Sequence, residues 1–199
     1  MNPENIHPIN DRMLQRCDKE GMLGQKAYVF WFCGLSGSGK STLAVNLERD
    51  LHNAGIHSVV LDGDNLRSSL CQDLAFSEED RAENLRRASE VAKILLSNGL
   101  VVIGSFISPK KEFRDFTRSI VGAESFREVY VKAPFKTCQQ RDVKGLYAKV
   151  QSGEIKNFTG SSSSFEEPIN PWITIETESE SPEESSKKLF ERIIKEVRN

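Results

Sequence analysis

The sequence predicts an α/β fold in which a mostly parallel, five-stranded sheet is covered by helices on both faces, in three layers. Short apolar runs alternate with amphipathic segments along most of the chain, and this alternation favours parallel strands joined by helices. A glycine-rich stretch stands between the first apolar run and the first amphipathic segment. The length of 199 residues suits a single domain of this class.

Each element follows from composition and periodicity. Residues Tyr28 to Cys33 are aromatic or apolar, as in a buried strand. The segment after the glycine-rich stretch repeats Leu43, Leu47 and Leu51, as an amphipathic helix does. The last helix has a similar stripe and begins near Pro182. In chain order, the predicted strands are 28–33, 57–61, 100–106, 127–132 and 172–175, and the predicted helices are 40–54, 78–98, 110–121, 134–140 and 182–197.

Two stretches fall outside the alternation. Residues 1–26 are polar with scattered apolar side chains, and we expect an N-terminal arm that packs on the core or on a second subunit. Residues 141–170 are polar and rich in glycine and serine. A long segment of weak regular structure in a compact domain is usually functional or disordered, so we expect a lid rather than an inert loop. The predicted organisation is an arm at 1–26 and one domain at 27–199.

Composition excludes several classes of protein. The chain is 38% hydrophobic and has a net charge of −2, so neither a disordered chain nor a binder of nucleic acid polymers is indicated. No apolar run approaches the roughly 18–20 residues of a membrane span, and residues 1–11 lack the apolar core of a secretory signal. The four cysteines form no Cys-x-x-Cys pair. This argues against a zinc ribbon and favours reduced thiols in a cytoplasmic protein.

The near-zero net charge averages two uneven regions. Residues 108–149 contain ten Lys or Arg and five Asp or Glu, whereas residues 165–185 contain seven acidic residues and no basic one. A basic middle suits anionic ligands. The alternative, for any single lysine, is a solvated surface of mixed charge.

A phosphate-binding motif follows the first predicted strand. Its residues fit G-x-x-x-x-G-K-[ST] and lead directly into a predicted helix, the context that this motif requires. Glycines let backbone N–H groups surround phosphate oxygens, the lysine reaches the β- and γ-phosphates, and the serine hydroxyl can ligate Mg²⁺. The motif indicates a P-loop NTPase fold that binds a nucleoside triphosphate, and it comprises Gly34, Leu35, Ser36, Gly37, Ser38, Gly39, Lys40 and Ser41.

Acidic residues follow the second predicted strand, in the run Asp62-Gly63-Asp64-Asn65. The carboxyl end of a strand beside a phosphate loop faces the crevice where ligands bind. Asp62, and with less support Asp64, can hold Mg²⁺ or accept the proton of an attacking hydroxyl. The alternative is an Asx turn in which Asp64 or Asn65 only shapes the loop.

Arginines and a serine extend the candidate site. Arg67, Arg81, Arg86 and Arg87 follow the acidic run, and the arginine fork suits sulfate and phosphate groups. Each of the four can equally be an ordinary helix-surface residue. Ser108 follows the third predicted strand, where it either contacts a substrate or caps the next helix.

These motifs resemble those of the adenylylsulfate kinases (APS kinases), and the resemblance runs along nearly the whole chain. Many families share the phosphate loop, so the two last motifs make the match specific. The matching stretches are Gly-Leu-Ser-Gly-Ser-Gly-Lys-Ser-Thr at 34–42, Leu-Asp-Gly-Asp-Asn at 61–65, Phe-Ile-Ser-Pro at 106–109, Arg-Asp-Val-Lys-Gly-Leu-Tyr at 141–147 and Gly-Glu-Ile-Lys-Asn-Phe-Thr-Gly at 153–160.

The resemblance implies a P-loop kinase domain at 27–199 that acts in sulfate assimilation. Such a kinase transfers the γ-phosphoryl group of MgATP to the ribose 3′-hydroxyl of adenosine 5′-phosphosulfate (APS), giving 3′-phosphoadenylylsulfate and ADP. A homodimer and a functional link to ATP sulfurylase are also implied.

The resemblance also assigns roles to residues. It implies catalytic roles for Lys40 and Asp62, Mg²⁺ ligation by Ser41 and Asp62, and ATP contacts by residues 34–41, Thr42 and Arg141. APS contacts are implied for Asp64, Asn65, Arg67, Phe76, Arg81, Asn84, Ile107, Ser108, Lys144, Phe158 and Thr159, with Phe76 and Phe158 around the adenine. Ser108 is also offered as a phosphorylated intermediate, a role that direct in-line transfer does not require.

The chain departs from the family's usual pattern beside the expected APS site and in the lid. The departures are at Ser68-Ser69, at Ala75, at Lys110-Lys111 and at Ser161–Ser164. We expect them to affect APS affinity and lid closure rather than the phosphate chemistry.

Other interpretations of the phosphate loop remain. A kinase for another nucleotide or a sugar would carry the same loop, and assays with alternative acceptors would distinguish it. A GTP-dependent switch would need a guanine-reading Asn-Lys-x-Asp motif, which the sequence lacks. A degenerate subunit that serves a sulfurylase is disfavoured by the intact Lys40, Ser41, Asp62 and Asp64.

Overall fold

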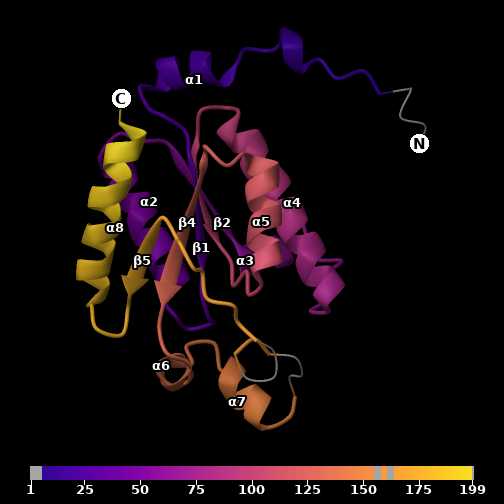
Figure 1. The fold of residues 1–199 in the computed structure, drawn as a ribbon, viewed down its shortest axis with the longest axis vertical. Helices are drawn as coiled ribbons and strands as arrows, with labels where there is room; N and C mark the ends of the chain where they lie inside the picture. Colours follow the sequence, from indigo (N-terminus) through magenta and orange to yellow (C-terminus); the bar gives the residue numbers. More distant parts are fainter. Residues whose placement is uncertain (1–5, 155–157, 161–163, 199) are drawn as a thin grey trace.

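A parallel sheet forms the centre of the protein (Figure 1). The computed structural model describes residues 6–154, 158–160 and 164–198. Over these residues, five strands run parallel in the order β2-β3-β1-β4-β5, which confirms the predicted sheet. The strands are β1 (Val29–Cys33), β2 (Ser58–Asp62), β3 (Val101–Ser105), β4 (Phe126–Lys132) and β5 (Ile173–Glu176).

Helices lie on both faces of the sheet, which confirms the three predicted layers. Helices α2 and α8 pack on one face, and α4 and α5 pack on the other. The helical elements are the 3₁₀ turn η2 (Asn10–Arg12), α1 (Arg16–Leu23), α2 (Lys40–Asn53), α3 (Gly63–Arg67), α4 (Glu78–Leu96), α5 (Lys111–Val121), α6 (Phe135–Arg141), α7 (Leu146–Gln151) and α8 (Pro182–Val197).

The central strand β1 contributes to both apolar layers. Phe30 and Phe32 join the core formed with α2 and α8, whereas Val29 and Trp31 join the core formed with α4 and α5. Successive side chains of a strand point to opposite faces, and all of β1 is buried. The aromatic run that predicted this strand therefore fills both sides of the sheet.

The long helices begin at the caps that their sequences indicate. Ser77 accepts a hydrogen bond from the backbone of Asp80 at the start of α4. Ser181 and Glu184 form a reciprocal capping box at the start of α8, with Pro182 in the first turn. Side-chain caps of this kind satisfy N–H groups that have no partner within the helix.

Short helices are the elements that the sequence did not predict. They are η2, α1, α3 and α7. In α3 the capping carboxylate is Asp62, which accepts from the backbone N–H of Asp64 at 3.0 Å. The sequence offered an Asx turn formed by Asp64 or Asn65 as an alternative. That alternative is wrong about the residue, because the side chain that caps the turn is Asp62.

The described part of the N-terminal arm crosses the end of the sheet opposite α6 and α7 (Figure 1). Gln25 is fully buried, and its side chain donates to the carbonyls of His57 and Gly99 and accepts from the backbone of His57. On α1, Arg16 and Lys19 contact Ser125 and Asn98 at the same end of the fold. The arm is therefore tied to the loops that precede β2, β3 and β4.

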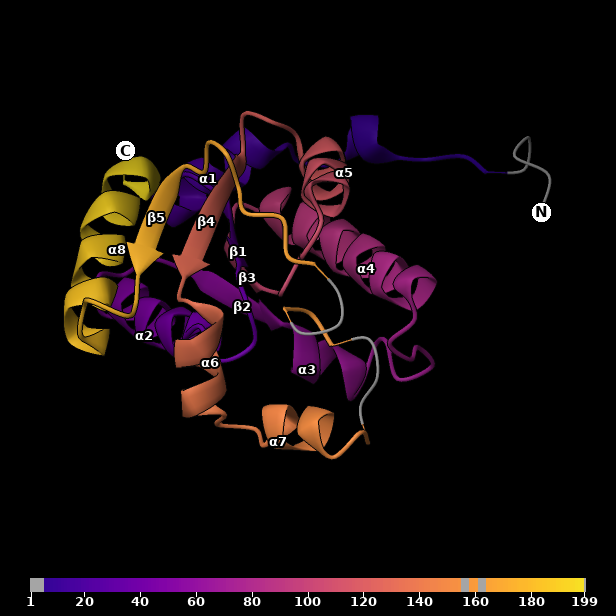
Figure 2. The same cartoon turned by 60° about the horizontal axis from the view of Figure 1, so that its bottom comes forward.

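The described part of the predicted lid lies beyond the carboxyl ends of the strands (Figure 2). It includes α7 and residues 158–160, whereas residues 155–157 and Ser161–Ser163 lie outside the described residues. Tyr147 and Phe158 form a small apolar cluster with Ala133 and Cys138 of the core, and Leu35 of the phosphate loop packs against it. The described residues of this segment thus pack against the phosphate loop.

The cysteines are free thiols. Cys33, Cys71 and Cys138 are buried and Cys17 is exposed. Burial raises the pKa of Cys33 to about 12. Among the described residues, no helix is long and apolar enough to cross a membrane.

Candidate active site

The phosphate loop joins β1 to α2 and needs glycine where its backbone is crowded. Gly37 has a φ of +77°, and a Cβ atom there would lie 2.9 Å from the carbonyl oxygen of Cys138. At Gly34 a Cβ atom would collide with the carbonyl of Val131. Only glycine fits such a conformation and such close approach without strain. The motif's glycines therefore shape the loop.

Lys40 lies inside the loop. Its Nζ donates to the carbonyl oxygens of Gly34 at 2.9 Å and Leu35 at 2.6 Å, and its side chain is buried. Burial lowers the pKa of Lys40 from 10.5 to about 8, because a desolvated ammonium group loses the stabilisation of water. The loop therefore encloses a cation that an entering phosphate group can pair with.

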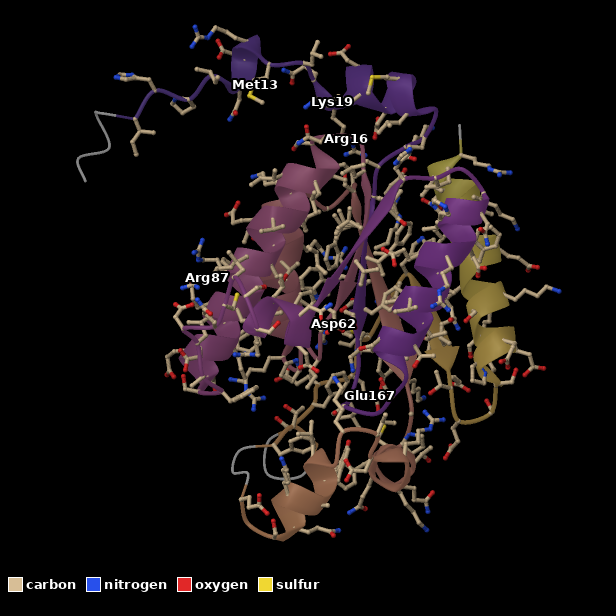
Figure 3. All side chains as sticks on the ribbon, turned by 180° about the vertical axis from the view of Figure 1, so that it is seen from behind. Met13, Arg16, Lys19, Asp62, Arg87 and Glu167 are labelled. Atoms are coloured by element: carbon tan, nitrogen blue, oxygen red, sulfur yellow. The ribbon has the colours of Figure 1, made fainter. Side chains whose placement is uncertain are left out.

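Ser41 and Asp62 form an oxygen-rich pair beside the loop. The Ser41 hydroxyl donates to Asp62 Oδ2 at 2.9 Å and lies 3.5 Å from Ser105 Oγ. Asp62 ends β2 and pairs in register with Ser105 of β3, and Figure 3 shows it toward the lid end of the sheet. Among the described residues, no group of three His, Cys, Asp or Glu side chains is placed to hold a metal ion. One carboxylate and a hydroxyl nevertheless fit Mg²⁺, which keeps several waters and takes substrate phosphate oxygens as ligands.

Arg141 and Thr177 hold the outer side of the phosphate loop. Arg141 donates to the carbonyl of Thr177 at 2.5 Å and to its hydroxyl at 3.0 Å. The Thr177 hydroxyl in turn donates to the carbonyl of Ser38 at 2.8 Å. Arg141 therefore lies beside the phosphate loop, while Thr177 is a residue that the sequence did not single out.

Tyr147 connects the lid to the loop. Its hydroxyl donates to the carbonyl of Ser36 at 2.8 Å, and its ring makes an edge contact with Phe158 at a centroid distance of 4.9 Å. Burial raises the pKa of Tyr147 above its usual value, so the hydroxyl stays protonated and remains a donor. Tyr147 stands inside one of the two motifs that made the resemblance specific, but the sequence assigns it no role.

Arg67, Phe76 and Arg81 form one cluster between α3 and the start of α4. The guanidinium of Arg67 lies 4.5 Å above the ring centre of Phe76 and donates to the carbonyl of Ala75 at 2.6 Å. Arg81 donates to the carbonyl of Phe76 at 3.0 Å and to Thr159 Oγ1 at 2.8 Å. Arg81 thus joins the Phe76 segment to the lid residues 158–160.

The two aromatic candidates differ in exposure. The Phe76 side chain is 65% exposed, whereas Phe158 is 7% exposed and packs on Tyr147. Phe76 is therefore free to take a planar ligand on its outer face, while Phe158 is already part of the lid cluster.

The remaining predicted site residues lie on α2, α3, α4 and the segment that includes α7. Lys144 of the lid pairs with Asp64 of α3, which joins these two segments. Asn84 on α4 is buried, and its Nδ2 has no hydrogen-bond partner among the described residues. Thr42 is exposed in the first turn of α2. The backbone carbonyl of Asn65 accepts the Ser68 and Ser69 hydroxyl groups, both at 2.9 Å.

Ser108 does not cap α5. The residue at the cap position is Lys110, and it makes no side-chain cap bond. The hydroxyl of Ser108 accepts instead from Trp31 Nε1 at 2.9 Å. The helix-cap alternative is therefore wrong, because the serine stands before the turn that Pro109 makes into the helix.

Arg86 and Arg87 lie on the surface of α4. Both bond to Glu83, and Arg87 also makes a bidentate contact with Asp73. Figure 3 shows Arg87 on the outer side of the helices. The surface alternative therefore holds for these two arginines, whereas Arg67 and Arg81 belong to the crevice.

The basic middle of the chain is largely neutralised by neighbouring acids. The pairs are Lys110–Glu78, Lys111–Asp115, Arg114–Glu128, Arg118–Glu128, Arg127–Glu196 and Lys132–Glu176. For these cations the ion pairs favour the alternative, a region of mixed charge. Arg141 and Lys144 are the members that lie at the crevice.

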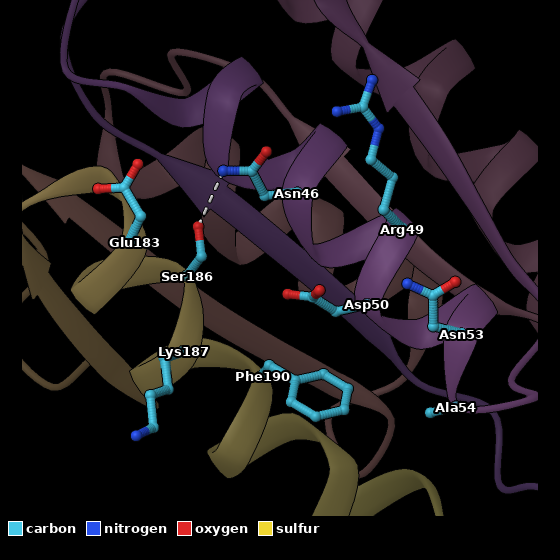
Figure 4. A pocket seen from close by; sticks show the side chains of 9 residues that line it. All are labelled: Asn46, Arg49, Asp50, Asn53, Ala54, Glu183, Ser186, Lys187 and Phe190. Atoms are coloured by element: carbon cyan, nitrogen blue, oxygen red, sulfur yellow. Dashed lines mark hydrogen bonds between the residues drawn. The ribbon is translucent and has the colours of Figure 1, made fainter.

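A groove on the other side of the molecule is distinct from this site. It lies between α2 and α8, has a volume of about 590 Å³, and includes Asn46, Asp50, Ser186 and Phe190 in its lining. Figure 4 shows the Asn46 side chain donating to Ser186 across it, at 3.0 Å. None of the predicted site residues lines this groove.

Comparisons with known proteins agree with the geometry. A sequence model of the family described as adenylylsulphate kinase matches residues 26–176. An adenylyl-sulfate kinase of Phocaeicola vulgatus is 51% identical over 98% of this chain and 95% of its own length. An adenylyl-sulfate kinase of Shewanella baltica is 56% identical over 86% of this chain and 81% of its own length.

A solved structure shares the arrangement of helices and strands. The APS kinase of Mycobacterium tuberculosis in complex with AMPPNP and APS is 44% identical, with a TM-score of 0.81, over 85% of this chain and 98% of that one. Such a likeness confirms the P-loop kinase fold that the sequence predicts. On the family match and on relatives that are half identical over most of their length, this chain belongs to the adenylylsulphate kinase family.

Proposed function

We propose that this protein transfers the γ-phosphoryl group of MgATP to the ribose 3′-hydroxyl of APS, giving 3′-phosphoadenylylsulfate and ADP. The observation that carries the proposal is the pairing of two sets of side chains beyond the carboxyl ends of the strands. The buried Lys40 and the Ser41–Asp62 pair stand on one side, and the cluster of Arg67, Phe76 and Arg81 stands on the other. The site thus offers one set of groups to a triphosphate and a second set to an aromatic anion.

Residues of the loop bind and orient the donor. The backbone of residues 34–41 and Thr42 surround the phosphates of ATP, and Arg141 contacts the nucleotide from the edge of the loop. On binding, Lys40 exchanges the carbonyls of Gly34 and Leu35 for phosphate oxygens, and its charge offsets the charge that develops on the transferring group. This requires Lys40 to be protonated when the donor enters.

Asp62 orients the acceptor hydroxyl or takes its proton. One carboxylate oxygen accepts from Ser41 and the other accepts from the backbone of Asp64, so the orientation of the carboxylate is fixed before substrate enters. Ser41 and Asp62 would also hold Mg²⁺, which supplies charge neutralisation at the phosphates when it is bound. No covalent role is needed for Ser108, because in-line transfer between two bound nucleotides is direct.

The acceptor side is formed by residues of α3, α4 and the lid. We assign APS contacts to Asp64, Asn65, Arg67, Phe76, Arg81, Asn84, Ile107, Ser108, Lys144, Phe158 and Thr159. The Arg81–Thr159 bond and the Lys144–Asp64 pair support a lid that spans this side. A closed lid excludes water, which would otherwise compete for the phosphoryl group.

The organisation of the chain and its surroundings complete the proposal. We divide the chain into an arm at 1–26 and a kinase domain at 27–199, with the lid at about 141–170.

A homodimer is supported by apolar side chains exposed on the arm, such as Leu14 at 71% and Met22 at 80%, and sedimentation analysis tests it. The four free thiols suit the reducing cytoplasm. An ATP sulfurylase is the functional partner that fits, because adenylyl transfer to sulfate makes APS.

Product analysis tests the reaction. With MgATP and APS, we expect the wild type to form ADP and 3′-phosphoadenylylsulfate in equal amounts, and to give little turnover with other nucleosides or sugars. Stronger turnover with one of those acceptors would contradict the proposal. We expect Asp62→Asn to lose about 100-fold or more in kcat, which is the range that a positioned acid or base contributes. Asp50→Asn in the distant groove is the matched control, and equal rates for the two variants would remove the catalytic role of Asp62.

A further inference from the structure

Ser108 has a strained backbone at a buried position. Its φ is +43°, and Asp142 is the other non-glycine residue with a positive φ among those described. The residue is 2% exposed. Strained conformations persist only where the surroundings hold them, and they cluster at functional sites. The groups that hold Ser108 are therefore of interest for the reaction.

Two buried donors hold Ser108 from opposite sides. Trp31 of β1 donates its indole N–H to Ser108 Oγ at 2.9 Å, and Arg114 of α5 donates Nη1 to the Ser108 carbonyl at 3.0 Å. Trp31 is fully buried and its ring stacks on Phe106 at 4.5 Å. Trp31 and Arg114 are both buried and both bond to Ser108, so we expect each to act on a ligand through this serine.

The same segment is tied to the phosphate loop. The backbone N–H of Gly34 donates to the carbonyl of Ile107 at 3.2 Å, and the backbone N–H of Glu166 donates to the carbonyl of Pro109 at 2.8 Å. Residues 107–109 are thus held to the loop on one side and to the chain that follows the lid on the other. A shift of Ser108 would therefore move it relative to the phosphate loop.

Arg114 is a charged residue at a buried position. Its side chain is 4% exposed, and its Nε lies 2.7 Å from Oε1 of Glu128 on β4. Burial raises the pKa of Glu128 above its usual value, even though Arg114 and Arg118 oppose that rise. A buried ion pair often stabilises a fold no better than apolar side chains of the same volume. The hydrogen bond from Arg114 to the Ser108 carbonyl therefore explains this buried ion pair better than fold stability does.

We propose that Arg114 and Trp31 are positioning residues for the acceptor nucleotide, which they act on by fixing Ser108 and Ile107 against the phosphate loop. Glu128 holds the Arg114 side chain in place through their ion pair. This inference rests on the proposed function, because it assumes that APS lies against residues 107–108. In the described part of the chain, the Ser108 hydroxyl accepts from Trp31 and has no acceptor of its own, so its proton remains available to the substrate.

Arg118 supplies a matched control. It lies one helical turn from Arg114 and faces the same Glu128 at 3.8 Å, but it is 39% exposed and makes no bond to Ser108. We expect Arg114→Gln to raise the KM for APS by about tenfold or more, the usual effect of losing a charged hydrogen bond. The KM for ATP should change less than twofold, a split that distinguishes positioning from general loss of structure. Arg118→Gln should leave both values near those of the wild type.

Two further variants keep the inference open to test if Arg114→Gln does not fold. Trp31→Phe keeps the stacked ring and removes only the indole donor, so the KM for APS should again rise more than that for ATP. Arg114→Met with Glu128→Gln removes both buried charges, and it should fold while keeping a raised KM for APS. Folded variants whose KM for APS is unchanged, or whose two KM values rise together, would overturn the inference. Failure of the wild type to use APS would instead overturn the proposed function.

Discussion

At the scale of single residues, Lys40 combines two properties that oppose each other. Its burial lowers its pKa to about 8, yet phosphate binding needs the charged form. As the pH rises through 8, the free protein loses the ammonium proton and with it the attraction for the donor. We therefore expect kcat/KM for ATP to fall above that pH, with the logarithm approaching a slope of −1, because kcat/KM reports the groups of the free enzyme.

A guanidinium at this position provides the check on that profile. Lys40→Arg keeps its charge throughout the alkaline range, so its residual activity should show no such decline. An unchanged alkaline limb in this variant would assign the pH dependence to another group. Lys40→Ala should lose about 100-fold or more in kcat, if the cation supplies several kcal/mol of stabilisation to the transition state.

At the scale of elements, a single side-chain hydrogen bond joins Tyr147 of α7 to the phosphate loop. The Tyr147 hydroxyl reaches the carbonyl of Ser36, while its ring stays within the apolar cluster of the lid. Tyr147→Phe keeps the packing and removes this bond, which is worth about 1 kcal/mol. We expect the KM for ATP to rise about fivefold, by the conversion of that energy to an affinity.

Tyr28→Phe is the control for this change. The Tyr28 ring packs near Phe30 at 6.1 Å, toward the opposite end of the sheet, so removal of its hydroxyl should leave steady-state kinetics unchanged. Equal effects of the two substitutions would show that the lid and the loop are not coupled through Tyr147.

At the scale of the whole molecule, the arm holds the end of the sheet that lies away from the site. Gln25→Ala would remove three hydrogen bonds of 2.7 to 3.0 Å to the backbone of His57 and Gly99. Buried backbone groups left without partners are costly, so we expect the free energy of unfolding to fall by about 3 kcal/mol. Urea denaturation should show a lower midpoint with an unchanged slope.

The exposed Gln72 is the control for that measurement. Gln72→Ala should change the free energy of unfolding by less than about 0.5 kcal/mol, as surface substitutions usually do. Where Gln25→Ala is still folded, its kinetics should equal those of the wild type, because Asp62 lies toward the end of the strands away from the arm (Figure 3). A loss of activity without loss of stability would instead connect the arm to catalysis.

How much the sequence predicts depends on the range of the interaction. The strands, the long helices and the phosphate loop follow from local patterns, such as the aromatic run of β1 or the cap at Ser77. Short helices such as α7 depend on tertiary contacts, and six residues are too few to show a period. Thr177 and Arg114 also depend on contacts between distant segments, and their residue types carry no signal of their own. The pairing of Lys110 with Glu78 and of Arg127 with Glu196 likewise depends on contacts between distant segments.

The burial of the cysteines has a practical consequence. Three of the four thiols are enclosed in the fold, and the pKa of about 12 at Cys33 makes its thiolate scarce at ordinary pH. A maleimide dye added to the native protein would meet an accessible sulfur at Cys17, on α1. Cys17 is therefore a selective labelling site, and a dye attached to it would report on the arm by fluorescence without an introduced cysteine.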